Sequence, residues 1–118
     1  MRRERDNAAS MYDEFERVAD ASEVPAGTSK AFAVGRFEVA VFNVGGTFYG
    51  LENCCPHQGG PLADGWLEGA QITCPWHAWC FDVRDGKMTL GDFARVPRFA
   101  VKELDGAILV RTEPEPYV

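Results

Sequence analysis

The sequence predicts an all-β domain built from antiparallel sheets. Short runs of apolar or alternating residues, each about the length of a strand, recur along most of its 118 residues. Glycine, proline and asparagine separate these runs, as they do in all-β folds. Gly45-Gly46 stands between two of the runs, and such a link is a strong hairpin signal because both positions adopt positive φ angles readily. A chain of this length is the size of one domain.

The individual elements follow from where apolar runs begin and where turn residues interrupt them. Pro25 and Gly27 interrupt the chain early, so residues 22–27 are expected to form a turn or a single helical turn. Asp85-Gly86 and Asp105-Gly106 mark two later turns. The expected strands, in chain order, are residues 15–19, 30–34, 37–44, 47–52, 66–68, 71–73, 81–83, 96–102 and 107–111.

Both ends of the chain are expected to lie outside this domain. Residues 1–13 begin with charges of mixed sign and are expected to form a flexible N-terminal extension. Residues 113–118 contain two prolines and are expected to form a C-terminal tail. The folded domain then spans residues 14–112.

Composition and charge narrow the possible functions. The formal net charge of −6 argues against non-specific binding to nucleic acid and suits docking onto a basic protein surface. No apolar stretch of signal-peptide length follows the N-terminus, and none approaches the roughly 20 residues that a membrane span needs. We therefore expect a soluble, cytoplasmic protein with neither membrane nor nucleic acid as a partner. Four cysteines in such a protein indicate metal or redox chemistry before disulfides.

Both histidines of the chain lie two or three residues after a cysteine. The first loop contains Cys55-Pro56-His57, and the second contains Cys74-Pro75-Trp76-His77. The pattern is therefore C-x-H, sixteen intervening residues, and C-x-x-H. Each loop follows an expected strand, so the side chains of both loops can converge on one point. The pattern predicts a four-ligand metal site made of Cys55, His57, Cys74 and His77.

The donor set leaves two kinds of metal centre open. Two thiolates and two imidazoles can hold a tetrahedral structural zinc ion. Typical zinc sites, however, pair cysteine with cysteine and histidine with histidine, whereas each loop here supplies one of each. A [2Fe–2S] cluster with two cysteines on one iron and two histidines on the other needs such a division, because each loop must give one ligand to each iron.

These loops resemble those of the Rieske iron–sulfur proteins. The resemblance is carried by the C-x-H and C-x-x-H pair, by Gly59-Gly60-Pro61-Leu62, by Cys74-Pro75-Trp76-His77 and by Phe81-Asp82. Ala78 departs from the pattern, since the family usually has glycine there. The resemblance implies antiparallel β-sheets with a cluster-binding subdomain formed by the two loops. It also implies one Rieske [2Fe–2S] cluster, with the histidines near the surface.

The resemblance further implies a low reduction potential. High-potential members of the family have a disulfide at the positions of Gly60 and Trp76, and hydroxyl donors at the positions of Trp79 and Phe81. This chain has neither, and fewer donors to the sulfurs stabilise the reduced state less. We expect the low end of the Rieske range, roughly −150 mV.

Four other residues in the loops lie outside the predicted ligand set. Cys54 would give C-x-x-H with His57, but the resemblance favours Cys55 as the ligand, and we expect Cys54 to be a small buried side chain. Cys80 is expected to be a packed thiol on a strand rather than a redox-active one. Trp76 and Trp79 flank His77, where they either shield the cluster and meet a partner or simply cover the loop.

The function predicted from these features is electron transfer without catalysis. We expect a soluble one-electron carrier between a flavin-containing reductase and a terminal oxygenase. Three alternatives stay open: a small subunit of an NAD(P)H nitrite reductase complex, a structural zinc module for protein interaction, and a redox or iron sensor. No catalytic residue is expected, because both histidines serve as ligands and the chain is too short for the mononuclear-iron domain of oxygenase large subunits.

Overall fold

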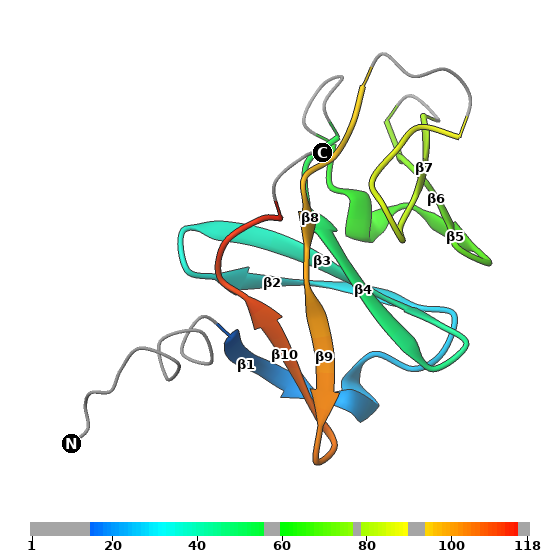
Figure 1. Ribbon diagram of the computed structural model, residues 1–118. Helices are drawn as coiled ribbons and strands as arrows, with labels where there is room; N and C mark the ends of the chain where they lie inside the picture. The colour runs from blue at the N-terminus through cyan, green and yellow to red at the C-terminus, as the bar shows by residue number, and fades with distance from the viewer. Residues whose placement is uncertain (1–14, 56–59, 77–78, 90–93, 116–118) are drawn as a thin grey trace.

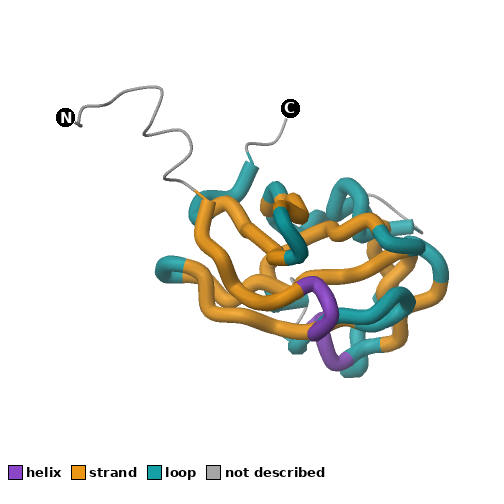
Figure 2. Tube along the Cα trace, turned by 90° about the horizontal axis from the view of Figure 1, so that it is seen from below, coloured by secondary structure: helices purple, strands orange, loops and turns teal. Residues whose placement is uncertain are grey.

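Short antiparallel strands make up most of the chain in the computed structural model, which describes residues 15–55, 60–76, 79–89 and 94–115. The strands are β1 (Phe15–Asp20), β2 (Ser29–Val34), β3 (Phe37–Val44), β4 (Thr47–Glu52), β5 (Trp66–Glu68), β6 (Gln71–Thr73), β7 (Cys80–Asp82), β8 (Arg98–Phe99), β9 (Val101–Leu104) and β10 (Ala107–Arg111). Two 3-10 turns, η2 (Ala21–Glu23) and η3 (Leu62–Asp64), accompany them. Strands and loops therefore account for nearly all of the trace (Figure 2).

The strands form three sheets, in the orders β1-β10-β9, β2-β3-β4-β8 and β5-β6-β7 (Figure 1). Every strand pair is antiparallel. The small β5-β6-β7 sheet lies apart from the other two, at the upper right of Figure 1. The all-β prediction is confirmed.

The four-stranded sheet is the middle layer because β3 is buried on both of its faces. Residues 39–43 of β3 are buried without a break, unlike the half-exposed strands around it. Successive side chains of a strand point to opposite faces, so Val39 and Val41 enter one core while Ala40 and Phe42 enter the other. The first core also holds Ile108 and Val110 of β10, and the second holds Ile72 of β6 and Phe81 of β7.

Most predicted strands are confirmed within a residue or two at their ends. Residues 37–44, 47–52, 66–68, 71–73 and 107–111 are strands with the expected bounds. The Gly45-Gly46 link has φ angles of 61° and 98°, as its hairpin requires. The expected turn at residues 22–27 overlaps η2, which begins one residue earlier and is closed by a hydrogen bond from the Val24 N–H to the Ala21 carbonyl.

The prediction of one strand over residues 96–102 is wrong. The chain changes sheets at Ala100: β8 pairs with β4, whereas β9 pairs with β10. The Arg111 N–H donates to the Ala100 carbonyl at 2.9 Å, which draws this point toward β10. Apolar alternation continues through the change of sheet, so the local pattern did not indicate it.

The expected N-terminal extension lies outside the described residues, as does the second half of the tail, residues 116–118. The described beginning of the tail is attached to the fold, because the Glu115 N–H donates to the Arg98 carbonyl and its carboxylate pairs with the Arg98 guanidinium. Within the described segments, no helix is long and apolar enough to cross a membrane.

Candidate metal centre

Two buried thiols occupy equivalent places after β4 and β6. Cys55 lies three residues past the end of β4, and Cys74 directly follows β6. Each side chain is 1% exposed, and both belong to the core between the middle sheet and the β5-β6-β7 sheet. Neither is in a disulfide. Two cysteines that are predicted ligands therefore lie together in one apolar core, as a site for a soft metal requires.

The first loop is closed by two hydrogen bonds, one inside the other. The Cys55 N–H donates to the Gly60 carbonyl at 2.8 Å. Outside that bond, the Ala63 N–H donates to the Asn53 side-chain oxygen at 2.7 Å, which joins the residues just before and just after the loop. Ser29 on β2 donates its hydroxyl to the Ala63 carbonyl at 2.8 Å and fastens the loop to the middle sheet.

The second loop is closed in the same way. The Cys74 N–H donates to the Trp79 carbonyl at 2.7 Å, again to the fifth residue after the cysteine. Just outside this bond, Thr73 and Cys80 are paired across β6 and β7, and their side-chain oxygen and sulfur lie 3.4 Å apart. Both cysteines are thus fixed at the base of a closed loop that rises from a strand.

The two loops meet at Gly60. A side-chain carbon added there would lie 3.0 Å from the Cys74 sulfur and 3.1 Å from Cγ of Trp76. Only a residue without a side chain leaves this space free. The Gly60 carbonyl also accepts the hydrogen bond from the Cys55 N–H. This glycine is therefore close to both cysteines.

The structure separates the two neighbouring cysteines of the first loop. Cys54 is exposed and Cys55 is buried, so the expectation that Cys54 is a small buried side chain is wrong. Both residues lie beyond the end of β4, so the packing of the loop, which places Cys55 in the core with Cys74, sets these directions. Partial burial of the thiol, reinforced by the negative charge of Glu52, raises the pKa of Cys54. Both observations favour Cys55 as the ligand.

The remaining predicted residues are placed in part. His57 and His77 lie outside the described residues, so the four-ligand set stays a prediction. Trp76 is 56% exposed, while Trp79 is half-buried and packs its ring 6.5 Å from that of Phe81. Cys80 is half-buried and not in a disulfide, in agreement with the packed thiol expected there.

Asn53 and Ser29 are positioning residues that sequence analysis missed. Their roles depend on contacts with Ala63, which is 10 and 34 residues away in the chain. A signal for Asn53 was nevertheless available. Asparagine next to a turn often accepts a backbone hydrogen bond, and Asn53 directly precedes the first cysteine loop.

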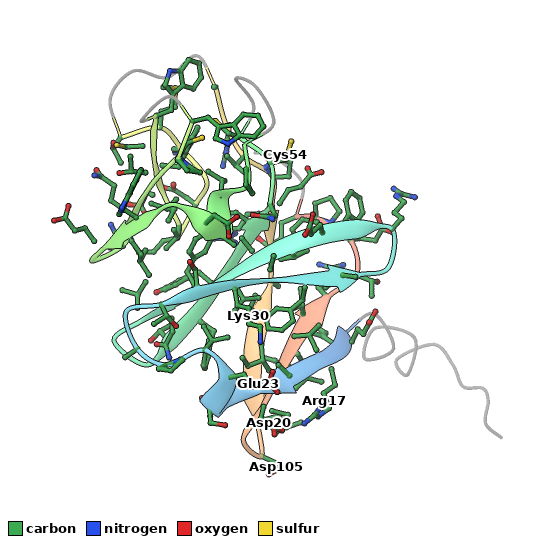
Figure 3. The ribbon with its side chains drawn as sticks, turned by 180° about the vertical axis from the view of Figure 1, so that it is seen from behind. Arg17, Asp20, Glu23, Lys30, Cys54 and Asp105 are labelled. Atoms are coloured by element: carbon green, nitrogen blue, oxygen red, sulfur yellow. The ribbon has the colours of Figure 1, made fainter. Side chains whose placement is uncertain are left out.

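The labelled charged side chains lie toward the end of the molecule away from Cys54 (Figure 3). Arg17 pairs with Asp20 there, and Lys30 pairs with Glu23 at 3.6 Å. The region around the two buried cysteines is apolar by contrast. Two thiols, a glycine that leaves space and an apolar core fit a sulfur-ligated metal cofactor.

Comparison with known proteins agrees with this fit. Residues 14–100 match the family model described as Rieske [2Fe-2S] domain. Ferredoxin CarAc of Metapseudomonas resinovorans is 35% identical over 100 residues, which cover 82% of this chain and 92% of that protein. The ferredoxin component of the naphthalene 1,2-dioxygenase/salicylate 5-hydroxylase systems of a Ralstonia species is 38% identical over 65 residues. That second match covers 55% of this chain and only 62% of the relative's length.

Two solved structures are also similar over most of the chain. The ferredoxin of carbazole 1,9a-dioxygenase from Nocardioides aromaticivorans IC177 has a TM-score of 0.79 and 32% identity, and the match covers 84% of this chain and 98% of that one. A chain in a complex of reduced oxygenase and oxidised ferredoxin of carbazole 1,9a-dioxygenase has a TM-score of 0.81 and 30% identity. This second match covers 88% of the present chain and 98% of the other.

Proposed function

This chain belongs to the Rieske [2Fe–2S] domain family, whose cofactor is one [2Fe–2S] cluster, and from that premise we propose that it is a one-electron carrier for a terminal oxygenase. The observation that carries the proposal is the pair of buried cysteines on two equivalently closed loops at one end of a β fold. A bound cluster supplies reversible one-electron chemistry. The protein's part is to bind the cluster, to limit water around the sulfurs and to leave one side open to a partner.

Four residues are proposed to hold the cluster. Cys55 and Cys74 would bind the inner iron through their buried sulfurs, and His57 and His77 would bind the outer one. Burial of both sulfurs in an apolar core protects a thiolate–metal bond from hydrolysis and oxidation. Neutral imidazoles in place of two thiolates make the site less negative, so its potential lies above that of all-cysteine clusters.

The proposed partners follow from the similar proteins. One of the solved structures is a complex between a ferredoxin and its oxygenase, which supports a terminal oxygenase as the acceptor for this chain. A flavin-containing reductase is proposed as the donor, because a two-electron donor such as NADH needs a group that releases electrons singly. None of the four cysteines in the described residues is in a disulfide, which suits the reducing cytoplasm that we propose as the location.

Four protein samples test the ligand assignment: the wild type and the variants Cys54→Ser, Cys55→Ser and Cys74→Ser. The wild type and Cys54→Ser should be red-brown and, after dithionite reduction, give the electron paramagnetic resonance spectrum of a histidine-ligated [2Fe–2S] cluster. Cys55→Ser and Cys74→Ser should lose that spectrum. Loss in Cys54→Ser with retention in Cys55→Ser would transfer the ligand role to Cys54.

The carrier role has its own measurement, a redox titration of the wild type. A midpoint near roughly −150 mV is expected for a Rieske cluster with few hydrogen bonds to its sulfurs. A strongly positive midpoint would contradict the proposed low-potential carrier while leaving the cluster assignment intact.

A further inference from the structure

Trp76 and Gly60 pack against each other between the two cysteine loops. Gly60 is buried, and the place of its missing side chain is bordered by Cγ and Cδ2 of Trp76, 3.1 and 3.2 Å from an added carbon, and by the Cys74 sulfur at 3.0 Å. An indole, a glycine and a ligand sulfur therefore meet at one point. Since 3.0–3.2 Å is closer than ordinary carbon contacts, no larger residue fits at position 60 without moving the indole or the sulfur.

This packing joins the two cysteine loops, each of which is closed by its own hydrogen bond. The bond from Cys55 to Gly60 closes the first loop on itself, and the bond from Cys74 to Trp79 closes the second. Gly60 is tied to Cys55 through its carbonyl and contacts Trp76 through its α-carbon side. A shift of Trp76 away from Gly60 would therefore loosen the position of Cys55 relative to Cys74.

The exposed fractions of Cys74 and Trp76 indicate that the indole covers the sulfur. Cys74 is 1% exposed, whereas Trp76, two residues further along, is 56% exposed. One part of the indole therefore faces solvent while another part lies against Gly60 next to the sulfur. An apolar ring in this place keeps water from the sulfur, and the apolar shell of a metal site controls its solvent access.

We propose that Trp76 is a positioning residue that joins the two cysteine loops by packing on Gly60 and that shields the Cys74 sulfur from water. This inference rests on the proposed function, because it assigns Trp76 a role toward the cluster that Cys55 and Cys74 would hold. If this role is correct, a variant without the indole releases the cluster faster. The role also requires a more positive reduction potential, because water admitted near the sulfurs stabilises the extra negative charge of the reduced state.

The experiment compares cluster-loaded wild type with Trp76→Ala, Trp76→Phe and the control Trp66→Ala. Trp66 is 62% exposed on β5, so its removal controls for the loss of an exposed tryptophan. Cluster release is followed as bleaching of the visible absorbance after addition of EDTA, and the midpoint potential is followed by voltammetry. Trp76→Ala should release the cluster at least about tenfold faster than the wild type, with a positive shift in potential. Trp76→Phe should recover part of both effects, and Trp66→Ala should stay within about twofold of the wild-type rate.

Gly60→Ala tests the same contact from the other loop. The added methyl group should displace the indole and speed cluster release. Its effect should be smaller in the Trp76→Ala background, because residues in contact give non-additive effects. Fully additive effects would show that the two residues do not act through one contact.

The outcomes separate this inference from the proposed function. Equal rates and potentials for Trp76→Ala and Trp66→Ala would overturn the role of Trp76 and leave the cluster assignment standing. If Trp76→Ala does not fold, Trp76→Phe and Gly60→Ala provide the comparison, and wild-type behaviour in both would likewise overturn it. A wild type that never takes up a cluster would overturn the proposed function and this role together.

Discussion

Cys54 and Cys55 are the same residue type at adjacent positions, yet their surroundings differ completely. The buried thiol of Cys55 lies in the apolar core near Cys74, and the exposed thiol of Cys54 has a raised pKa. A metal ligand must lose its proton and be held in a fixed place. Only Cys55 has the second property, so the direction of the side chain decides between them.

A single glycine also controls how closely the two loop regions approach. Gly65 has φ −81°, which any residue can adopt, but an added carbon there would lie 2.0 Å from the Thr73 carbonyl oxygen. We expect Gly65→Ala to destabilise the protein by at least about 2 kcal/mol, because the overlap displaces the backbone just before Cys74. Denaturant unfolding measures this cost.

The turn glycine Gly69 provides the control for Gly65→Ala. Gly69 has φ 59° and nothing within 4 Å of an added carbon, so Gly69→Ala meets only backbone strain. Its cost should be about 1 kcal/mol. A smaller loss for Gly65→Ala than for Gly69→Ala would show that the loops tolerate separation.

At the scale of elements, the β3–β4 hairpin is locked to the turn before β2 by one buried asparagine. Asn43 is 6% exposed and donates its side-chain N–H to the Val24 carbonyl at 2.7 Å. Its side-chain oxygen accepts the Gly46 N–H at 2.8 Å. The same side chain thus supports the hairpin turn and fixes the segment that enters β2.

Asn43→Ala should therefore lower the free energy of unfolding by about 2 kcal/mol, because it leaves a buried carbonyl without its donor. Thermal or denaturant unfolding gives the value. Thr28→Ala is the matched control, since it removes an exposed hydrogen bond of 2.7 Å to Pro25 in the same segment. Equal losses in the two variants would contradict the importance assigned to burial.

The turn after β7 contains an ion pair with a predictable pH dependence. Arg84 donates two side-chain hydrogen bonds to the Asp82 carboxylate, at 2.9 and 2.7 Å. These bonds lower the pKa of Asp82 below its ordinary value. A lowered pKa in the folded state stabilises the protein above the unfolded pKa, and this contribution is lost as pH falls through the folded one.

Wild type should accordingly be slightly more stable than Arg84→Ala at pH 7, by a small margin because Arg84 is exposed to solvent. The difference should shrink as pH falls from about 4, the ordinary pKa of aspartate, through the lowered pKa of Asp82 in the folded protein. Urea unfolding of both proteins between pH 7 and pH 3 tests this. In the Asp82→Asn background, the effect of Arg84→Ala on stability should not change with pH. A pH-independent difference between wild type and Arg84→Ala would contradict the assignment.

On the scale of the whole molecule, the middle sheet separates two cores of different kinds. The core toward β1-β10-β9 is made of aliphatic and aromatic side chains alone. The core toward β5-β6-β7 includes both cysteines, and the strands of that sheet are three residues long. Such short strands form few hydrogen bonds, so this part of the protein depends more on what the cysteines bind.

Removal of the cluster should therefore loosen one part of the molecule and spare the other. Hydrogen exchange should become at least about tenfold faster in β5, β6 and β7 of the apo protein. Exchange in β3 and β10 should change little. Uniform acceleration throughout the chain would show instead that the two cores unfold as one unit.

Local sequence patterns by themselves predicted most of the strands and the family of this protein. Alternation and turn residues predicted the hairpin at Gly45-Gly46 and most of the strands, because both signals act over a few neighbouring residues. The spacing of cysteine and histidine predicted the family for the same reason, since each loop carries its predicted ligands within four residues. The ligand roles of Cys55, His57, Cys74 and His77 stay predictions.

Only the tertiary structure decided the features that join distant segments. The change of sheet at Ala100 depends on β4 and β10, which are remote in sequence. The outward direction of Cys54 beside an inward Cys55 depends on the core that Cys55 shares with Ile72 and Phe81. The fastening of the first loop by Ser29 and the contact of Trp76 with Gly60 likewise join residues that no local pattern relates. Periodicity describes which face a residue can take, whereas packing against other segments settles which face is buried.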